Sequence, residues 1–437
     1  MVNVSYFKDR FEQLQGASPD GEIARLRLEG FDNFNNSGLP SLRNEEWKYT
    51  NISSLFDKEY ELPGDNENPD ISRSDLDAVR LPGHSIANEL VFVNGLFMPG
   101  LSTIRSPHNQ LTVTPLEDAA RGIYKDLVKQ HLGQSSMYVK DGIHALNTSF
   151  IYGGVFIHIA KGQQLGHPVY LYHLSDVRGH HMLSQPRSLI YAGEGSKLQL
   201  VETYQTIGTA DSFTNQVMEV VINDGTYMEY YKLQNDTANS SQVSTTHIRQ
   251  TGRSYVHTVT ITLNGGMIRN NMNLILDAPG NETHLYGLYM LKGNTHADNH
   301  TLVDNQQPNC FSNQLYKGIV DDTATAVFNG KIMVRPQAQK TNAYQSNKNI
   351  LLSDRAGINT KPQLEIFADD VKCSHGCTIG QLDETALFYL RTRGISMENA
   401  QAMLLQAFAD DILVQIKPQL LREHVRQLIT LQLFNTK

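Results

Sequence analysis

From about residue 147 to residue 364, the chain consists of short apolar or alternating segments separated by Gly, Asn or Asp. Examples are GGVFIHI, HPVYLYHL, QVMEVVI and HTVTITLNGGMIRNNMNLIL. Such segments, with no amphipathic helix between them, predict an all-β region. A sandwich or closed barrel rarely needs this length, whereas a β-solenoid grows along one axis as each coil buries its inward face. We therefore predict a mainly β fold with a β-solenoid of about nine or ten coils, at roughly 20–25 residues per coil.

Helical patterns precede this β region. Residues 6–15 (YFKDRFEQLQ) and 21–31 (GEIARLRLEGF) have apolar residues at helical spacing. Residues 61–82 are polar and rich in Pro, Asp and Asn, which predicts a linker or long loop. Residues 89–98 (ELVFVNGLFM) predict a hairpin, because the pair Asn94-Gly95 suits a type I′ turn.

Helical patterns also follow the β region. Asp383 and Ser396 are good N-cap residues, and Gly394 sits where a helix should end. The second of these helices has an apolar face at three- and four-residue steps. Its expected members are Ala400, Met403, Leu404, Ala407, Phe408 and Ile412. The predicted domains are a helical or mixed region with a linker (1–146), the β-solenoid core (147–382) and a C-terminal helical domain (383–437).

The overall composition restricts the partners of the chain. Its formal net charge of −8 argues against nucleic acid, because phosphate binding needs a clustered excess of Lys and Arg. No run of eighteen apolar residues occurs, so no membrane-spanning helix is predicted. The N-terminus lacks the pattern of a signal peptide. A cytoplasmic location is therefore expected, with Cys310, Cys373 and Cys377 as free thiols.

The stretch DDVKCSHGCTIGQLDE places two of the three cysteines beside a histidine. On a strand, Cys373, His375 and Cys377 would share one face, with the two cysteines roughly 13 Å apart. Two thiolates on one zinc ion lie within roughly 5 Å of each other, so this pair cannot close a mononuclear site unless Gly376 breaks the strand. Such an incomplete ligand set favours a shared or transient metal site.

Structural explanations of these residues remain open. Cys373 could be a small apolar residue of the solenoid interior, and Cys377 could fill space in the core or on the surface. His375 could be a polar residue with its hydrogen bonds satisfied. The segment HADNH lies in a strand and loop region, which favours solvated or packed roles for His296 and His300. No phosphate-binding loop, H-E-x-x-H motif or nucleophile elbow is present.

One long segment carries a specific resemblance. KPQLEIFADDVKCSHGCTIGQLDETALFYLRTRGI resembles the signature of the SufB/SufD family of iron–sulfur cluster assembly proteins, and its details favour the SufD branch. The segments DNHTLVDNQQPNCFSNQLYKGIVDDTATAVFNGKIMV, AQKTNAYQSNKNILLS and RNEEWKYTNISSL extend the match. Together they cover most of residues 280–410 and a short N-terminal block. The middle of the predicted solenoid matches only in its general pattern of short apolar or alternating segments.

The resemblance implies a right-handed parallel β-helix flanked by N- and C-terminal helical domains, in a scaffold protein without enzymatic activity. It implies pairing with a SufB-like subunit through the end of the β-helix, and docking of a SufC-like ATPase on the C-terminal helices. That ATPase would bind the ATP. No cofactor would be bound permanently, and a transient iron–sulfur cluster would be shared with the SufB-like partner.

The resemblance also implies roles for particular residues. His375 matches the histidine implicated at the partner contact, and Cys373 matches the cysteine of the motif, for which the case is weaker. Cys377 stands where relatives commonly carry a small residue, so its role is left open, either as an added ligand or as a space-filling residue. The sequence also leaves open whether the chain alone is a monomer or a homodimer.

Two alternative functions can be stated from the sequence. A β-helix enzyme acting on an acidic polysaccharide would need a groove of clustered basic and carboxylate residues, and it would usually be secreted. The sequence shows neither a basic cluster nor a secretion signal. A self-sufficient metal-binding protein would hold stoichiometric metal in the isolated chain.

Overall fold

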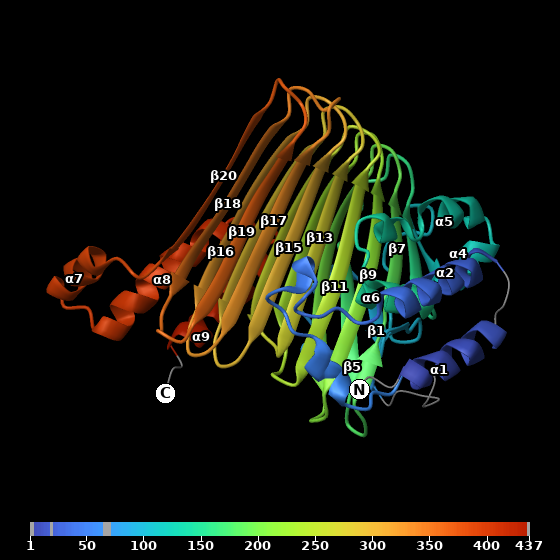
Figure 1. Cartoon of the computed structure of the whole chain (residues 1–437), viewed down its shortest axis with the longest axis horizontal. Helices are drawn as coiled ribbons and strands as arrows, with labels where there is room; N and C mark the ends of the chain where they lie inside the picture. Colours follow the sequence, from blue (N-terminus) through green and yellow to red (C-terminus); the bar gives the residue numbers. More distant parts are fainter. Residues whose placement is uncertain (1–3, 18–20, 64–70, 435–437) are drawn as a thin grey trace.

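A β-solenoid of about eight turns forms the body of the protein. The computed structural model describes residues 4–17, 21–63 and 71–434. Figure 1 shows two long rows of strands running obliquely through the molecule, with helices at both ends of the row. The predicted fold class, a solenoid with helices on both sides, is confirmed.

Two sheets form the walls of the solenoid. The first sheet has the order β2-β1-β5-β8-β10-β12-β14-β16-β18-β20. Its strands are β1 (Asn88–Val93), β2 (Leu96–Phe97), β5 (Val169–Asp176), β8 (Lys197–Ile207), β10 (Tyr227–Asn235), β12 (Tyr255–Asn264), β14 (Glu282–Leu291), β16 (Phe311–Val320), β18 (Asn342–Leu351) and β20 (Lys372–Gly380).

The second sheet has the order β19-β17-β15-β13-β11-β9-β7-β4-β3, with β6 also pairing with β9. Its strands are β3 (Leu111–Pro115), β4 (Val155–Ile159), β6 (Met182–Ser184), β7 (Arg187–Ala192), β9 (Ser212–Ile222), β11 (Ser240–Gln250), β13 (Met267–Leu276), β15 (His296–Asn305), β17 (Thr325–Val334) and β19 (Gly357–Ile366). Among the described strands, neighbours are parallel except in the pairs β1–β2 and β3–β4.

Each turn is longer than the sequence pattern indicated. The first residues of successive strands in the first sheet lie side by side and are 27 to 31 positions apart: Tyr227, Tyr255, Glu282, Phe311, Asn342 and Lys372. The expected repeat of roughly 20–25 residues was therefore wrong, and with it the count of nine or ten coils. The reason is that a turn holds one strand of about ten residues in each sheet plus two corners.

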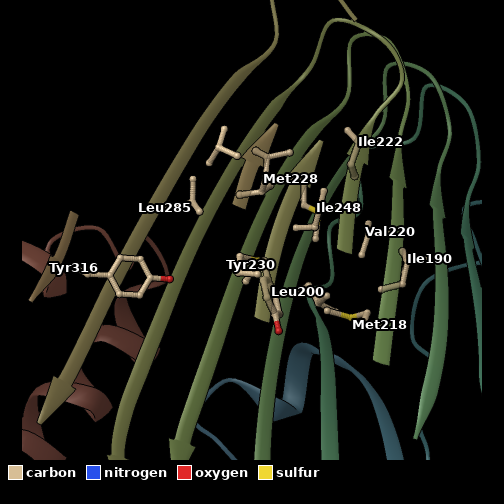
Figure 2. Packing of buried hydrophobic residues seen from close by; sticks show 14 of the residues in the cluster. Ile190, Leu200, Met218, Val220, Ile222, Met228, Tyr230, Ile248, Leu285 and Tyr316 are labelled. Atoms are coloured by element: carbon tan, nitrogen blue, oxygen red, sulfur yellow. The ribbon is translucent and has the colours of Figure 1, made fainter. Parts of the chain in front are cut away.

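Apolar side chains from both sheets fill much of the space between them. Figure 2 shows Leu200 and Met228 of the first sheet lying near Val220 and Ile248 of the second. All four are fully buried or nearly so, and burial of each such side chain stabilises the fold by about 1.5–3 kcal/mol relative to exposure. Because every turn buries its inward face against the next, the core continues along the whole solenoid.

The N-terminal region covers the first turns. The predicted hairpin is confirmed, since Val93 pairs with Leu96 and the turn residues Asn94 and Gly95 have φ values of 51° and 85°. Two strands of this region extend the sheets: β1 belongs to the first sheet and β3 to the second. The predicted linker contains a short helix, and residues 64–70 lie outside the described residues. The helices are α1 (Val4–Ala17), α2 (Glu22–Ser37), α3 (Arg73–Val79), α4 (Leu116–Arg121), α5 (Lys125–His131) and α6 (Gly142–Ser149), with 3-10 turns at Glu45–Trp47, Ser53–Asp57, His84–Ile86 and Gln134–Met137.

Three helices end the chain, α7 (Glu384–Thr392), α8 (Met397–Leu413) and α9 (Gln419–Phe434). The predicted N-caps are confirmed: the Asp383 side chain accepts from the backbone of Thr385, and Ser396 accepts from Asn399. α8 and α9 pack on the outer face of the first sheet. Within the described residues, no helix is long and apolar enough to cross a bilayer.

The apolar face predicted for α8 was only partly right. Ala400 and Ile412 are buried as expected, but Met403 is 47% exposed. The buried side is formed by Ala400, Ala402, Leu405, Ala409, Ile412 and Leu413. The helix is rotated from the predicted orientation because it packs against both the sheet and α9, which helical periodicity alone does not define.

Candidate functional site at the open end of the solenoid

The C-S-H-G-C segment forms β20, the last strand of the first sheet. β20 pairs with β18 on one side, and within the described part of the chain no strand pairs with its other side. Figure 1 shows it as the outermost strand of its row. The Lys372 N–H donates to the Thr341 carbonyl, so the even-numbered residues bond to β18. The backbone N–H and C=O groups of Cys373, His375 and Cys377 therefore point to the free edge.

These three side chains lie on the inward face of β20. Their neighbours in register on β18 are Ala343, Gln345 and Asn347, which are all buried inside the solenoid. Among the described residues no further turn covers β20, so His375 and Cys377 are exposed and Cys373 is half-buried. The predicted strand is confirmed and Gly376 does not interrupt it, while the ligand roles of the three residues stay predictions.

Cys373 is the most enclosed of the three residues. It packs against the edge of the apolar core, as do Ile358 and Leu364 of β19, the last strand of the second sheet. Burial raises the pKa of the Cys373 thiol, although a hydrogen bond from the Ala343 backbone opposes this effect. In the single chain, this sulfur is therefore a neutral thiol at pH 7 and a poor metal ligand, because metals bind the thiolate.

One chain does not assemble a complete ligand set at β20. Across residues 4–17, 21–63 and 71–434, no three His, Cys, Asp or Glu side chains gather in a way that could hold a metal ion. The three cysteines are free thiols, as predicted. Cys310 lies away from β20 in the core, where its thiol donates to the Ala278 carbonyl at 3.4 Å.

A second polar cluster, which the sequence did not indicate, joins residues 44–50 to the outer face of the second sheet. Arg269 donates to Asp298 at 2.7 Å, and its guanidinium lies 3.9 Å from the Trp47 ring centre. His300 contacts Asp298 at 3.0 Å, and His296 contacts Thr50 at 2.9 Å. Both histidines are thus packed, as predicted. More than two hundred positions separate the two halves of the cluster, so no local pattern could reveal it.

Comparison with known families identifies the class of this protein. The model of the SUF system FeS cluster assembly SufBD core domain matches residues 174–408. The model of the SufBD protein N-terminal region matches residues 4–171. The chain belongs to the SufBD family of SUF iron–sulfur cluster assembly proteins.

Individual relatives agree with this assignment. An iron–sulfur cluster assembly SufBD family protein of Synechocystis sp. is 31% identical over 430 residues, covering 96% of this chain and 93% of the relative. The iron–sulfur cluster assembly protein SufD of Escherichia coli is 29% identical over 397 residues, covering 89% and 88%. SufD of Bacillus subtilis is 27% identical over 317 residues, covering 68% of each. The resemblance predicted from the sequence is confirmed, and the chain has a role in SUF iron–sulfur cluster assembly.

Proposed function

We propose that this protein is a scaffold subunit without catalytic activity of its own, which holds a nascent iron–sulfur cluster at β20 together with a SufB-like subunit. The observation that carries the proposal is the position of His375, exposed on the inward face of a strand whose outer edge is unpaired among the described residues. Membership of the SufBD family supports the assembly role. The cytoplasmic location inferred from the sequence is part of this proposal.

Pairing along the free edge of β20 would bring the partner to the site. An edge strand with free N–H and C=O groups is a template for another strand. Exposed apolar side chains lie beside it: Ile379 is 48% exposed on β20, and Phe367 is 60% exposed just after β19. Covering them with a partner strand would remove apolar surface from water and stabilise the complex.

The incomplete ligand set suits a cluster that is cargo rather than a resident cofactor. His375 offers one imidazole nitrogen, and Cys373 would add a thiolate only if its pKa fell on contact with iron. A thiolate from the SufB-like subunit would supply the remaining donor. Few donors from each side would hold the cluster loosely enough to pass it on.

The SufC-like ATPase, which would bind the ATP, would dock on α7 and the start of α8. α7 has no buried residue, and it projects from the body of the molecule in Figure 1. Its exposed apolar residues include Phe388 at 70% and Tyr389 at 57%. Large aromatic residues left in water on a projecting helix are typical of a docking surface.

His375→Ala tests the cluster site. We expect the complex to assemble normally, because the side chain is exposed, and the activity of iron–sulfur enzymes in cells that depend on this system to fall at least about tenfold. Ser374→Ala, on the opposite face of β20, is the matched control and should leave that activity unchanged. Normal maturation of these enzymes by His375→Ala would refute the proposed role.

A double variant, Phe388→Ser with Tyr389→Ser, tests the docking surface. Loss of two exposed aromatic anchors should weaken ATPase binding by at least about thirtyfold, measured by titration calorimetry or co-purification. Leu431→Ser, at a residue on α9 that is 55% exposed, is the control. Equal ATPase binding by the double variant and the control would show that the ATPase docks elsewhere.

A further inference from the structure

A row of polar side chains on the inner face of the first sheet leads to His375. The in-register positions on β16, β18 and β20 are Gln314, Gln345 and His375. Both glutamine side chains are buried. Because these strands are parallel neighbours, the side chains of one row stand beside one another, about 4.8 Å apart. Gln345 is therefore the side chain of the paired strand that lies next to the imidazole.

The hydrogen bonds of this row give the Gln345 amide a direction. The Gln345 Nε2 donates to Gln314 Oε1 at 2.9 Å. The Gln314 Nε2 in turn donates to Thr301 Oγ1 on β15 at 2.5 Å. The donor end of the Gln345 amide therefore faces β16, away from β20. Since the oxygen and the nitrogen of an amide point in different directions, the Gln345 Oε1 is left on the side of His375.

That oxygen is buried, and within the described part of the chain it has no hydrogen-bond partner. An unpaired buried acceptor costs free energy, which a suitably placed donor recovers. Gly330 on β17 holds the amide in place, because a Cβ at this position would overlap both Nε2 and Cδ of Gln345. The acceptor is thus fixed beside β20, and the next polar side chain of its row is the imidazole of His375.

We propose that Gln345 is a positioning residue of the cluster site. Its Oε1 accepts a hydrogen bond from Nδ1–H of His375, which leaves Nε2 unprotonated as the ligand atom. The Nδ1–H bond of an imidazole points sideways from the side chain, towards a neighbouring strand, whereas Nε2 lies at the outer end of the ring. The hydrogen bond made by one ring nitrogen decides which nitrogen is free to bind a metal.

The hydrogen bond changes what His375 can offer a cluster. A neutral imidazole in water favours the tautomer with its hydrogen on Nε2, and that hydrogen blocks the outer nitrogen. The Gln345 oxygen reverses this preference and also restricts rotation of the ring. This role rests on the proposed function and deepens it, since it concerns the same imidazole.

Nitrogen NMR of the isolated full chain tests the hydrogen bond without any partner. The histidine rings are labelled with ¹⁵N, and the signals of His375 are those that disappear in His375→Ala. At pH 8 an exposed imidazole is neutral. The wild type should then show His375 with its hydrogen on Nδ1. Gln345→Leu removes the acceptor but still fills the space, so His375 should change to the tautomer with its hydrogen on Nε2.

Two further variants separate positioning from general damage. Gly330→Ala displaces the Gln345 amide without removing a polar group, and it should change the His375 tautomer as Gln345→Leu does. Asn347→Ala is the matched control, because this buried amide is on the same face of β18 but in register with Cys377. It should leave the tautomer unchanged. Hydrogen on Nε2 in the wild type, no change in Gln345→Leu, or the same change in Asn347→Ala would overturn the hydrogen bond.

Activity in cells tests the positioning role. Gln345→Leu should lower the activity of iron–sulfur enzymes in cells that depend on this system by about tenfold. Combined with His375→Ala, it should cause no further loss, because the amide acts only through the imidazole. Additive losses, or normal activity of Gln345→Leu where His375→Ala is inactive, would overturn the role of Gln345 and leave the proposed function standing. Failure of the proposed function itself would instead appear as normal activity of His375→Ala.

Discussion

The two ends of the solenoid differ in how their sheets end. At the N-terminal end, β2 pairs antiparallel with β1 and β3 pairs antiparallel with β4, so each sheet ends on a strand running against the others. Helices α2 and α6 lie over the same end in Figure 1. At the C-terminal end, β19 and β20 are the last strands of their sheets in the described part of the chain. The N-terminal end is therefore protected from further strand pairing, whereas the C-terminal end is open to it.

Buried charge distinguishes the ends as well. At the closed end, Arg187 donates to Glu219 at 2.6 Å, and both side chains are almost completely buried. The Glu219 carboxylate also accepts from the backbone N–H groups of Gly133 and Ser135 at 2.8 and 2.7 Å. This end therefore has satisfied buried ions that fix one arrangement. At the open end, the side chains of His375 and Cys377 are exposed, and the proposed function lies there.

The largest predicted effect is the fall in stability when the ion pair at the closed end is broken. Arg187→Ala would leave the Glu219 carboxylate buried without its guanidinium partner. We expect the free energy of unfolding to fall by about 3–5 kcal/mol, measured by urea denaturation of the isolated chain. The comparison also needs a variant at the open end. Cys377→Ala, at an exposed position, should change the same quantity by no more than about 0.5 kcal/mol. Similar losses in the two variants would show that the ends do not differ in this way.

Local patterns accounted for much of the fold. Short alternating segments bounded by Gly and Asn predicted the strands, and Asp383 and Ser396 marked helix starts because a cap bonds residues only three positions away. The length of a turn could not be predicted in the same way. From β7 onwards, successive strands alternate between the two sheets, and the corner lengths vary, so no fixed repeat is present in the sequence.

For the candidate site, only those features that follow from the geometry of a single strand could be predicted. Alternation along a strand correctly placed Cys373, His375 and Cys377 on one face. Their different exposures arise because β20 is the last strand of its sheet in the described part of the chain, which no short pattern encodes. The Arg187–Glu219 pair and the cluster around Asp298 were missed because their partners come from strands or segments far apart in the sequence.

Mild acidification should cause a smaller loss of stability, and this loss should again differ between the two ends. Burial lowers the pKa of His247 to about 4, although Glu219 opposes the effect, and burial similarly lowers the pKa of His144 on α6. A histidine with a lowered pKa binds a proton more readily in the unfolded chain. Its stabilising contribution is therefore complete above pH 6.5 and declines as the pH falls towards 4. Between pH 7.5 and pH 5, His247 alone should cost about 2 kcal/mol of stability.

Glu219 contributes at still lower pH. Burial alone would raise its pKa, but Arg187 and the N–H groups of Ser135 and Gly133 lower it to about 2. The stability that it provides is present above its unfolded pKa and is lost only as the pH falls below about 4.5. At pH 5 the histidines should therefore dominate. The protection factors for hydrogen exchange, which correct for the slower intrinsic exchange at lower pH, should then fall in α6 and β11 but not in β18 and β20, where His375 is already exposed to water. Replacement of His247 by Gln should reduce the loss of protection in β11. An equal loss of protection at both ends, or an unchanged pH response in His247→Gln, would show that buried histidines do not set the acid sensitivity of the closed end.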